Sequence, residues 1–146
     1  MNKFELIIFD CDGVLVDSER ITAKVLANVL QEECGLSFSL GDLLETFMGQ
    51  TSEQSLIIIE EMLGFKPPSG LEARYQSEIN KALEESVTAV NGIWQALREI
   101  TIPYCVASGG SYEKMQTTLG KTNLLKLFKD KLYSTSDVQN GKPFPD

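Results

Sequence analysis

Two short apolar segments, each ending in a polar residue, place the strongest constraint on the fold of this chain. Residues 5–10 read ELIIFD and end in a carboxylate, and residues 103–108 read PYCVAS and end in a hydroxyl. A continuous apolar run is typical of a strand that is buried on both faces of a parallel sheet. Residues 131–134 are a weaker candidate for a third strand. The pattern therefore predicts an α/β fold built on a parallel sheet.

The segment between the first two strands is too long for a simple crossover, which needs only about a dozen residues or more. Apolar periodicity and helix-start signals divide it into helices, the capping-box pattern Thr51-x-x-Gln54 being one such signal. The helices are expected at 18–34, 40–47, 52–64 and 70–87, with others at 93–100 and from about Ser111. We therefore expect an α/β core at 1–17 and 88–146, interrupted by an all-α domain at 18–87.

Composition excludes several classes of function. The chain has 13 Lys and Arg against 21 Asp and Glu, a net charge of −8 with no basic block, which argues against a nucleic-acid partner and against an anionic membrane surface. The chain contains no histidine, so Ser-His-Asp and Cys-His catalysis and His-ligated zinc are excluded. Proton transfer must then fall to carboxylates, lysine, tyrosine or a perturbed cysteine.

The cysteines and the amino terminus indicate the compartment. Cys11, Cys34 and Cys105 are odd in number and form no C-x-x-C pair, so neither a disulfide framework nor a zinc site is predicted. The apolar run near the amino terminus is too short for a signal peptide or a transmembrane span. We expect a cytoplasmic protein.

The segment Asp10-Cys11-Asp12-Gly13 follows the first strand, where ligands bind in open α/β sheets. In extended chain both carboxylates point to one side and Cys11 points away. Two carboxylates this close repel each other unless a cation lies between them or one keeps its proton, and Mg²⁺ suits such oxygen ligands. Asp10 and Asp12 can also simply form a turn, and the residues by themselves leave both interpretations open.

Three motifs in order resemble the haloacid dehalogenase-like superfamily. FDCDGVLVDSE at 9–19 resembles its first motif, VASGG at 106–110 its second and GKPFPD at 141–146 its third. The chain is similar to the branch that includes β-phosphoglucomutases and phosphoglycolate phosphatases, and looks most like the 6-phosphogluconate phosphatase group. The resemblance implies a Rossmann-like core with an inserted helical cap at 18–87.

The resemblance also implies catalytic roles. Asp10 would attack phosphorus and form an aspartyl-phosphate while its other oxygen holds Mg²⁺, and Asp12 would serve as general acid and base with its backbone carbonyl on the metal. Ser108 and Gly109 would bind phosphoryl oxygens, and Lys142 would neutralise their charge. Cys11 is placed at the same phosphate site. Without the resemblance, Ser108 is more simply a helix cap and Lys142 an exposed loop lysine.

The cap sequence favours one reaction over another. FMGQTSEQSL at 47–56 resembles the loop in which β-phosphoglucomutases carry an arginine that grips a second phosphate, and Ser52 stands in its place here. We expect Gly49, Gln50 and Thr51 to contact substrate, although a plain turn before a helix also explains them. The favoured function is an Mg²⁺-dependent phosphatase that acts on a small phosphorylated metabolite as a monomer.

Three other interpretations stay open. The first is a β-phosphoglucomutase-like phosphoryl transferase. The second is a response-regulator receiver domain, which has no room for a long helical insert after its first strand. The third is a noncatalytic fragment or binding module, because the family continues past the third motif to an acidic pair that completes the metal site. On that basis we expect a chain that is incomplete and poorly active, with Pro145-Asp146 marking the start of a further helix. We also expect the strand at 5–10 to be an exposed edge of the sheet.

Overall fold

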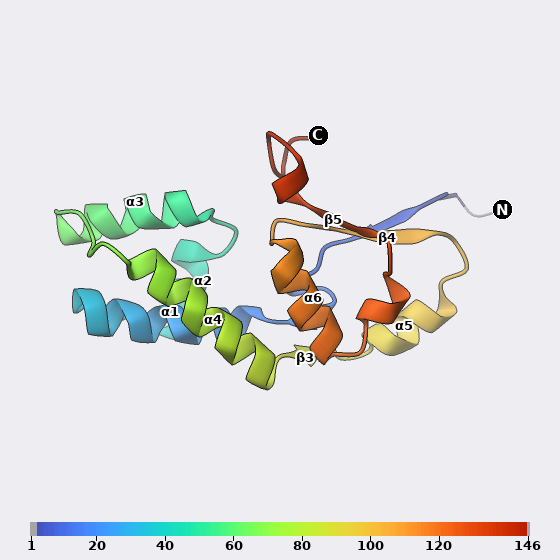
Figure 1. Ribbon diagram of the computed structural model, residues 1–146, viewed down its shortest axis with the longest axis horizontal. Coiled ribbons are helices and arrows are strands. Elements are labelled where there is room, and N and C mark those ends of the chain that lie inside the picture. The colour runs from blue at the N-terminus through green and yellow to red at the C-terminus, as the bar shows by residue number, and fades with distance from the viewer. Residues whose placement is uncertain (1–2, 146) are drawn as a thin grey trace. The chain divides into compact units, whose positions relative to one another are not determined.

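Residues 3–145 are described by the computed structural model, and they divide into two compact units (Figure 1). The sheet unit consists of the residues up to Ser18 and from Ser86 onward, and the helical unit is Glu19–Glu85. The helix start expected at 145–146 involves Asp146, which lies outside the described residues. Within the described part of the chain, no helix is long and apolar enough to cross a membrane.

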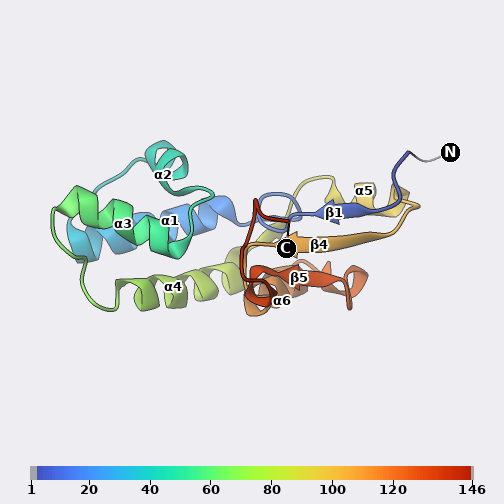
Figure 2. The same cartoon turned by 90° about the horizontal axis from the view of Figure 1, so that it is seen from above.

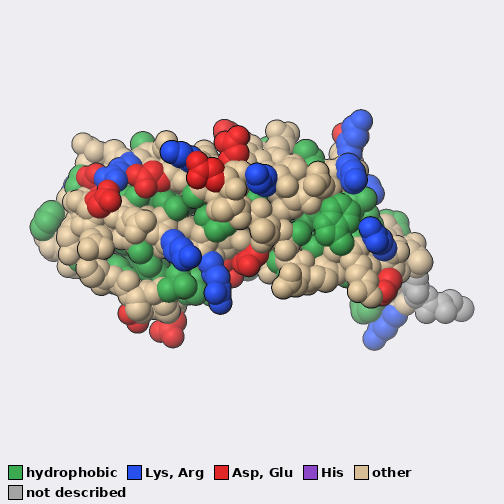
Figure 3. Space-filling view, turned by 90° about the horizontal axis from the view of Figure 1, so that it is seen from below, with side chains coloured by type: hydrophobic (Ala, Val, Ile, Leu, Met, Phe, Trp, Pro, Cys, Tyr) green, Lys and Arg blue, Asp and Glu red, His purple; other side chains and the backbone are tan. Residues whose placement is uncertain are grey.

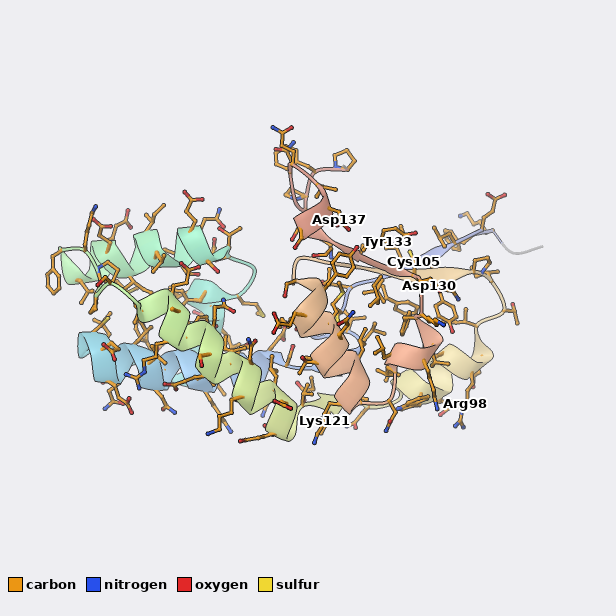
Figure 4. All side chains as sticks on the ribbon, viewed as in Figure 1. Arg98, Cys105, Lys121, Asp130, Tyr133 and Asp137 are labelled. Atoms are coloured by element: carbon orange, nitrogen blue, oxygen red, sulfur yellow. The ribbon has the colours of Figure 1, made fainter. Side chains whose placement is uncertain are left out.

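The sheet unit contains a parallel three-stranded sheet, which confirms the α/β class. Its strands are β1 (Ile7–Phe9), β4 (Tyr104–Ser108) and β5 (Leu132–Ser134), hydrogen-bonded in the order β1-β4-β5. The register pairs Ile8 with Cys105 and Ala107 with Tyr133. Figure 2 shows the strands side by side, and Figure 4 labels Cys105 and Tyr133 on neighbouring strands.

The first strand is an exposed edge of the sheet, as expected for residues 5–10, although its apolar run is typical of burial on both faces. Among the described residues β1 pairs only with β4, so it forms an edge of the sheet. Ile8 is 62% exposed, and Leu6 just before the strand is also exposed. The helices α5 (Ile93–Glu99) and α6 (Tyr112–Lys121) both lie on the same face of the sheet in Figures 1 and 2. The connections from β1 to β4 and from β4 to β5 advance in the same direction across the sheet, and right-handed crossovers of this kind place their helices on one face. On the other face, no helix of the described chain covers Ile8.

The buried core of the sheet unit lies beneath β4. Val106, Leu119 and Phe128 have no exposed surface. The Phe128 ring makes edge-to-face contacts with Phe9 and Tyr104, which join the chain after α6 to two strands. Two short 3-10 helices complete this region, η1 (Leu125–Leu127) and η2 (Thr135–Asp137). This packing joins the carboxyl end of β1 and the amino end of β4 to the chain that follows α6.

A small antiparallel ribbon was not predicted. It pairs β2 (Val16–Asp17) with β3 (Thr88–Ala89), where the chain leaves for the helical unit and where it returns. Two residues are too few to show a periodic pattern, so sequence reasoning missed both strands. The ribbon holds these two chain segments together.

The helical unit agrees closely with the predicted helices. Its helices are α1 (Glu19–Cys34), α2 (Leu40–Phe47), α3 (Ser52–Leu63) and α4 (Leu71–Ser86). Their most deeply buried side chains are Val29, Leu30, Leu43, Ile59 and Leu83. Arg74 on α4 forms ion pairs with Glu32 and Glu33 on α1 and with Glu78. Figure 3 shows acidic and basic side chains interspersed on one face of this unit.

Candidate active site

The candidate site lies at the carboxyl ends of two parallel strands. Asp10 follows β1 directly, and Ser108 is the last residue of β4. Because Phe9 and Val106 are partners in the register, the two strands end at the same edge of the sheet. Ligands bind at this edge in open α/β sheets, so the polar residues that end the two apolar segments lie where chemistry is expected.

The Asp10 carboxylate is accessible and forms an ion pair with a lysine. Its Oδ1 accepts a hydrogen bond from the Cys11 backbone N–H at 2.8 Å and lies 3.1 Å from Lys142 Nζ. Both side chains of this ion pair are 49% exposed. No partner of Oδ2 is found among residues 3–145. The structure therefore brings two sequence-predicted residues, Asp10 and Lys142, into direct contact and leaves one carboxylate oxygen available.

Asp12 is held on both of its oxygens. Oδ1 accepts a hydrogen bond from Ser18 Oγ at 2.5 Å, and Oδ2 lies 3.0 Å from Lys114 Nζ. The chain turns directly after Asp12, since Gly13 has a φ of 76°, a value that glycine adopts without strain. Sequence reasoning considered Ser18 only as a helix cap and did not single out Lys114. A lysine in the first turn of a helix is unfavourable next to the helix dipole, and this was the available signal.

The loop after β4 is held in place by hydrogen bonds within itself and to the chain after β5. Ser108 is buried, and its Oγ accepts a hydrogen bond from the Gly110 N–H at 3.0 Å. The cap of α6 is Ser111, whose side chain accepts from Lys114 N, so the alternative use of Ser108 as a helix cap is wrong. The Gly109 carbonyl accepts a hydrogen bond from the Thr135 hydroxyl at 2.9 Å. That bond fastens the loop to the residues that follow β5.

Cys11 takes part through its backbone. Its side chain is 1% exposed, and burial, followed by the charge of Asp12, raises the pKa of its thiol to about 12. The thiol therefore stays protonated at neutral pH and is a poor nucleophile. Only the N–H of Cys11 is directed at a site residue, the carboxylate of Asp10. The sequence predicted that Cys11 points away from the side shared by Asp10 and Asp12, and the burial of the Cys11 side chain agrees with this prediction.

The three residues singled out in the helical unit form a turn and a cap. Gly49, Gln50 and Thr51 are exposed between α2 and α3. The Thr51 side chain accepts from the Gln54 N–H, and the Gln54 side chain accepts from the Thr51 N–H, which completes a capping box. The turn interpretation is thus confirmed, and contact of these residues with substrate stays a prediction.

The oxygen donors at the strand end fit part of a magnesium site. Residues 3–145 contain no cluster of three or more His, Cys, Asp or Glu side chains arranged around a metal position. The available donors are an oxygen of Asp10 and the backbone carbonyl of Asp12. Mg²⁺ is commonly held by one or two carboxylates together with water and substrate phosphate, so these hard oxygen donors fit part of a magnesium site.

The chain is similar to one protein family and to several named proteins. The family described as "Haloacid dehalogenase-like hydrolase" matches residues 7–146. The 6-phosphogluconate phosphatase of Escherichia coli (strain K12) is 34% identical over 146 residues, which cover 99% of this chain and 66% of that protein. The phosphorylated carbohydrates phosphatase of Thermotoga maritima is 28% identical, with 97% and 66% covered. The chain thus spans slightly less than two thirds of the length of these relatives.

Solved structures resemble the fold over nearly the whole chain. A conserved haloacid dehalogenase-like protein of unknown function from Agrobacterium tumefaciens superposes with a TM-score of 0.88 at 35% identity, covering 98% of this chain and 65% of that one. A hydrolase from Deinococcus radiodurans, crystallised with bound phosphate and sodium, superposes with a TM-score of 0.75 at 33% identity, covering 98% and 63%.

Proposed function

The chain belongs to the haloacid dehalogenase-like hydrolase family, and from this premise we propose that it is part of an Mg²⁺-dependent phosphatase of a small phosphorylated metabolite. The observation that supports the proposal most directly is the pair of carboxylates at one strand end, each with a lysine against it. A sugar phosphate or sugar-acid phosphate is the proposed substrate class, in keeping with relatives that are named as phosphatases of 6-phosphogluconate and of phosphorylated carbohydrates.

Asp10 is the proposed nucleophile. One of its oxygens attacks phosphorus, so a bond forms between Asp10 and the phosphoryl group while the bond to the leaving oxygen breaks. Two observations support this role. The Asp10 side chain is half exposed, and its contacts with Cys11 and Lys142 are both made by Oδ1, which leaves Oδ2 available to attack. When bound, Mg²⁺ would be held by Asp10 and the Asp12 carbonyl and would offset the negative charge of the phosphoryl group. Lys142 adds a second positive charge beside the same carboxylate.

Asp12 is the proposed general acid and base. It gives a proton to the leaving oxygen, and in the second step it takes a proton from the water that hydrolyses the aspartyl-phosphate. The hydrogen bond from Ser18 supports this role because it fixes the orientation of the carboxylate. Leaving groups of high pKa depend most on such a proton donor.

Ser108, Gly109 and the amino terminus of α6 are proposed to bind the phosphoryl oxygens. Backbone N–H groups at a helix amino terminus attract anions, and Ser108 stands directly before the loop that leads into α6. The helical unit is proposed to act as the substrate-selecting cap. Ser52, in place of an arginine that would hold a second phosphate, favours hydrolysis over phosphoryl transfer between two positions of a sugar.

The experiment is phosphate release from para-nitrophenyl phosphate with and without Mg²⁺, using the protein as the cell makes it. We expect Asp10→Asn to lower kcat by at least about 10³-fold, because it removes the nucleophile. Asp130→Asn is the matched control, since Asp130 lies away from the site (Figure 4) and asparagine tolerates its positive φ of 60°. Unchanged turnover in Asp10→Asn would refute the assignment of the nucleophile.

A further inference from the structure

One cation at the site has no role in the proposed reaction. Lys114 lies 3.0 Å from Asp12 Oδ2, and its side chain is 27% exposed while that of Asp12 is 29% exposed. The contact joins residues that are 102 positions apart in the sequence. Lys142 already serves the nucleophile, so Lys114 is a second and separate positive charge beside the proposed proton donor.

The position of Lys114 is unfavourable for the helix itself. It lies in the first turn of α6, where Ser111 accepts a hydrogen bond from its backbone N–H. Positive charge in this turn opposes the helix dipole, whereas Glu113 beside it has the favourable sign. Natural sequences break one or two such local rules at functional sites. The lysine is therefore better explained by what its ammonium contacts than by helix stability.

The two oxygens of Asp12 have different surroundings. Oδ1 accepts a hydrogen bond from the Ser18 hydroxyl, whereas Oδ2 lies beside Lys114 and Gly110. A side chain at Gly110 would place its Cβ 3.7 Å from Oδ2 and 3.4 Å from both Ser108 Oγ and Lys114 Cδ. The glycine thus leaves open the space between the proposed phosphate site and Lys114. A leaving oxygen that approaches Oδ2 brings its neighbouring atoms to the Lys114 ammonium.

We propose that Lys114 binds a carboxylate on the leaving group and selects phosphorylated hydroxy acids over their uncharged counterparts. This inference rests on the proposed function, because it assigns the leaving group to the Asp12 side of the phosphate. An ammonium has three N–H donors and Asp12 takes one, which leaves donors for substrate. A charge-assisted bond to a carboxylate is about twice as strong as a bond to a neutral hydroxyl.

The test compares two substrates that differ only at the proposed contact. One is 2-phosphoglycerate, whose carboxylate is on the carbon that bears the phosphate, and the other is glycerol 2-phosphate, which has a hydroxymethyl group in place of that carboxylate. We expect Lys114→Gln to lower kcat/KM for 2-phosphoglycerate by about 10- to 100-fold and to change that for glycerol 2-phosphate by less than about threefold. Lys114→Arg retains most of the preference. Lys121→Gln, at the opposite end of α6 (Figure 4), is the control and leaves both values unchanged.

Two results would overturn the inference. An equal fall with both substrates would mean that Lys114 acts only by orienting Asp12, and no fall with either would mean that it does not face the leaving group. If the unmodified protein releases phosphate from neither compound, release from para-nitrophenyl phosphate decides about the proposed function and equilibrium binding of the two compounds decides about Lys114. Tighter binding of 2-phosphoglycerate that is lost in Lys114→Gln would support the inference, and equal affinities would refute it.

Discussion

The two units of the molecule use charged residues in opposite ways. In the helical unit, Arg74 is surrounded by Glu32, Glu33 and Glu78, on its own helix and a neighbouring one, and the cluster joins α4 to α1. In the sheet unit, Asp10 and Asp12 are paired with lysines from segments far away in the sequence, at an accessible strand end. The first arrangement supports packing, whereas the second concentrates charge where a ligand can reach it. The comparison predicts that substitutions in the two units affect different measurements.

The largest expected effect concerns the proton donor in the sheet unit. We expect Asp12→Asn to lower kcat/KM by about 10²- to 10⁴-fold for an alkyl phosphate, because the leaving alkoxide then has no acid to protonate it. The loss should be much smaller for para-nitrophenyl phosphate, whose leaving group needs no proton. Steady-state kinetics with both substrates tests this. Equal losses for the two substrates would contradict the role of Asp12 as the acid that protonates the leaving group.

The matching substitution in the helical unit should affect stability and leave chemistry intact. Leu83 on α4 is 1% exposed, so Leu83→Ala removes buried contacts and leaves a cavity. We expect the free energy of unfolding to fall by about 2–5 kcal/mol, while kcat for the folded protein stays within about threefold. Denaturant unfolding measures the first quantity. Ile57→Ala, at a largely exposed position on α3, is the control and should cost less than about 0.5 kcal/mol.

The smallest expected effect is a pH dependence that originates in the sheet unit. Burial raises the pKa of Cys11 to about 12 from the 9.0 of an exposed thiol. Above pH 9 the unfolded chain loses this proton and the folded protein keeps it, so the contribution to stability is complete below pH 9 and falls as the pH rises. We expect the free energy of unfolding to decrease by about 1.4 kcal/mol between pH 8 and pH 10 from this thiol.

Cys11→Ala isolates that contribution. The variant should show a shallower decline of unfolding free energy over the same pH range, measured by urea denaturation at each pH. Cys34→Ala in the helical unit, where the cysteine is partly exposed, should keep most of the slope. An identical slope in the wild type and in Cys11→Ala would contradict the burial of this thiol in the native protein.

Local signals predicted the helical unit well. The predicted ranges 40–47 and 52–64 nearly coincide with α2 and α3, because Ser39 and Thr51 form side-chain caps whose effect depends only on adjacent residues. The apolar run of β1 did not by itself show that the strand is exposed, because such a run records what a strand can bury and not what covers it. The β2–β3 ribbon was missed because its strands are too short to show a period.

The sequence by itself determined the parallel sheet, most helix ends and the family, and through the family motifs it indicated Asp10, Asp12, Ser108 and Lys142. Only the tertiary structure decided that Ser18 and Lys114 hold the two oxygens of Asp12 and that Ser111, not Ser108, caps α6. The physical reason is the range of the interaction. Caps and periodicity act within a few residues and can be recognised in the chain, whereas the partner of a carboxylate is set by which strand ends and helix termini the fold brings together.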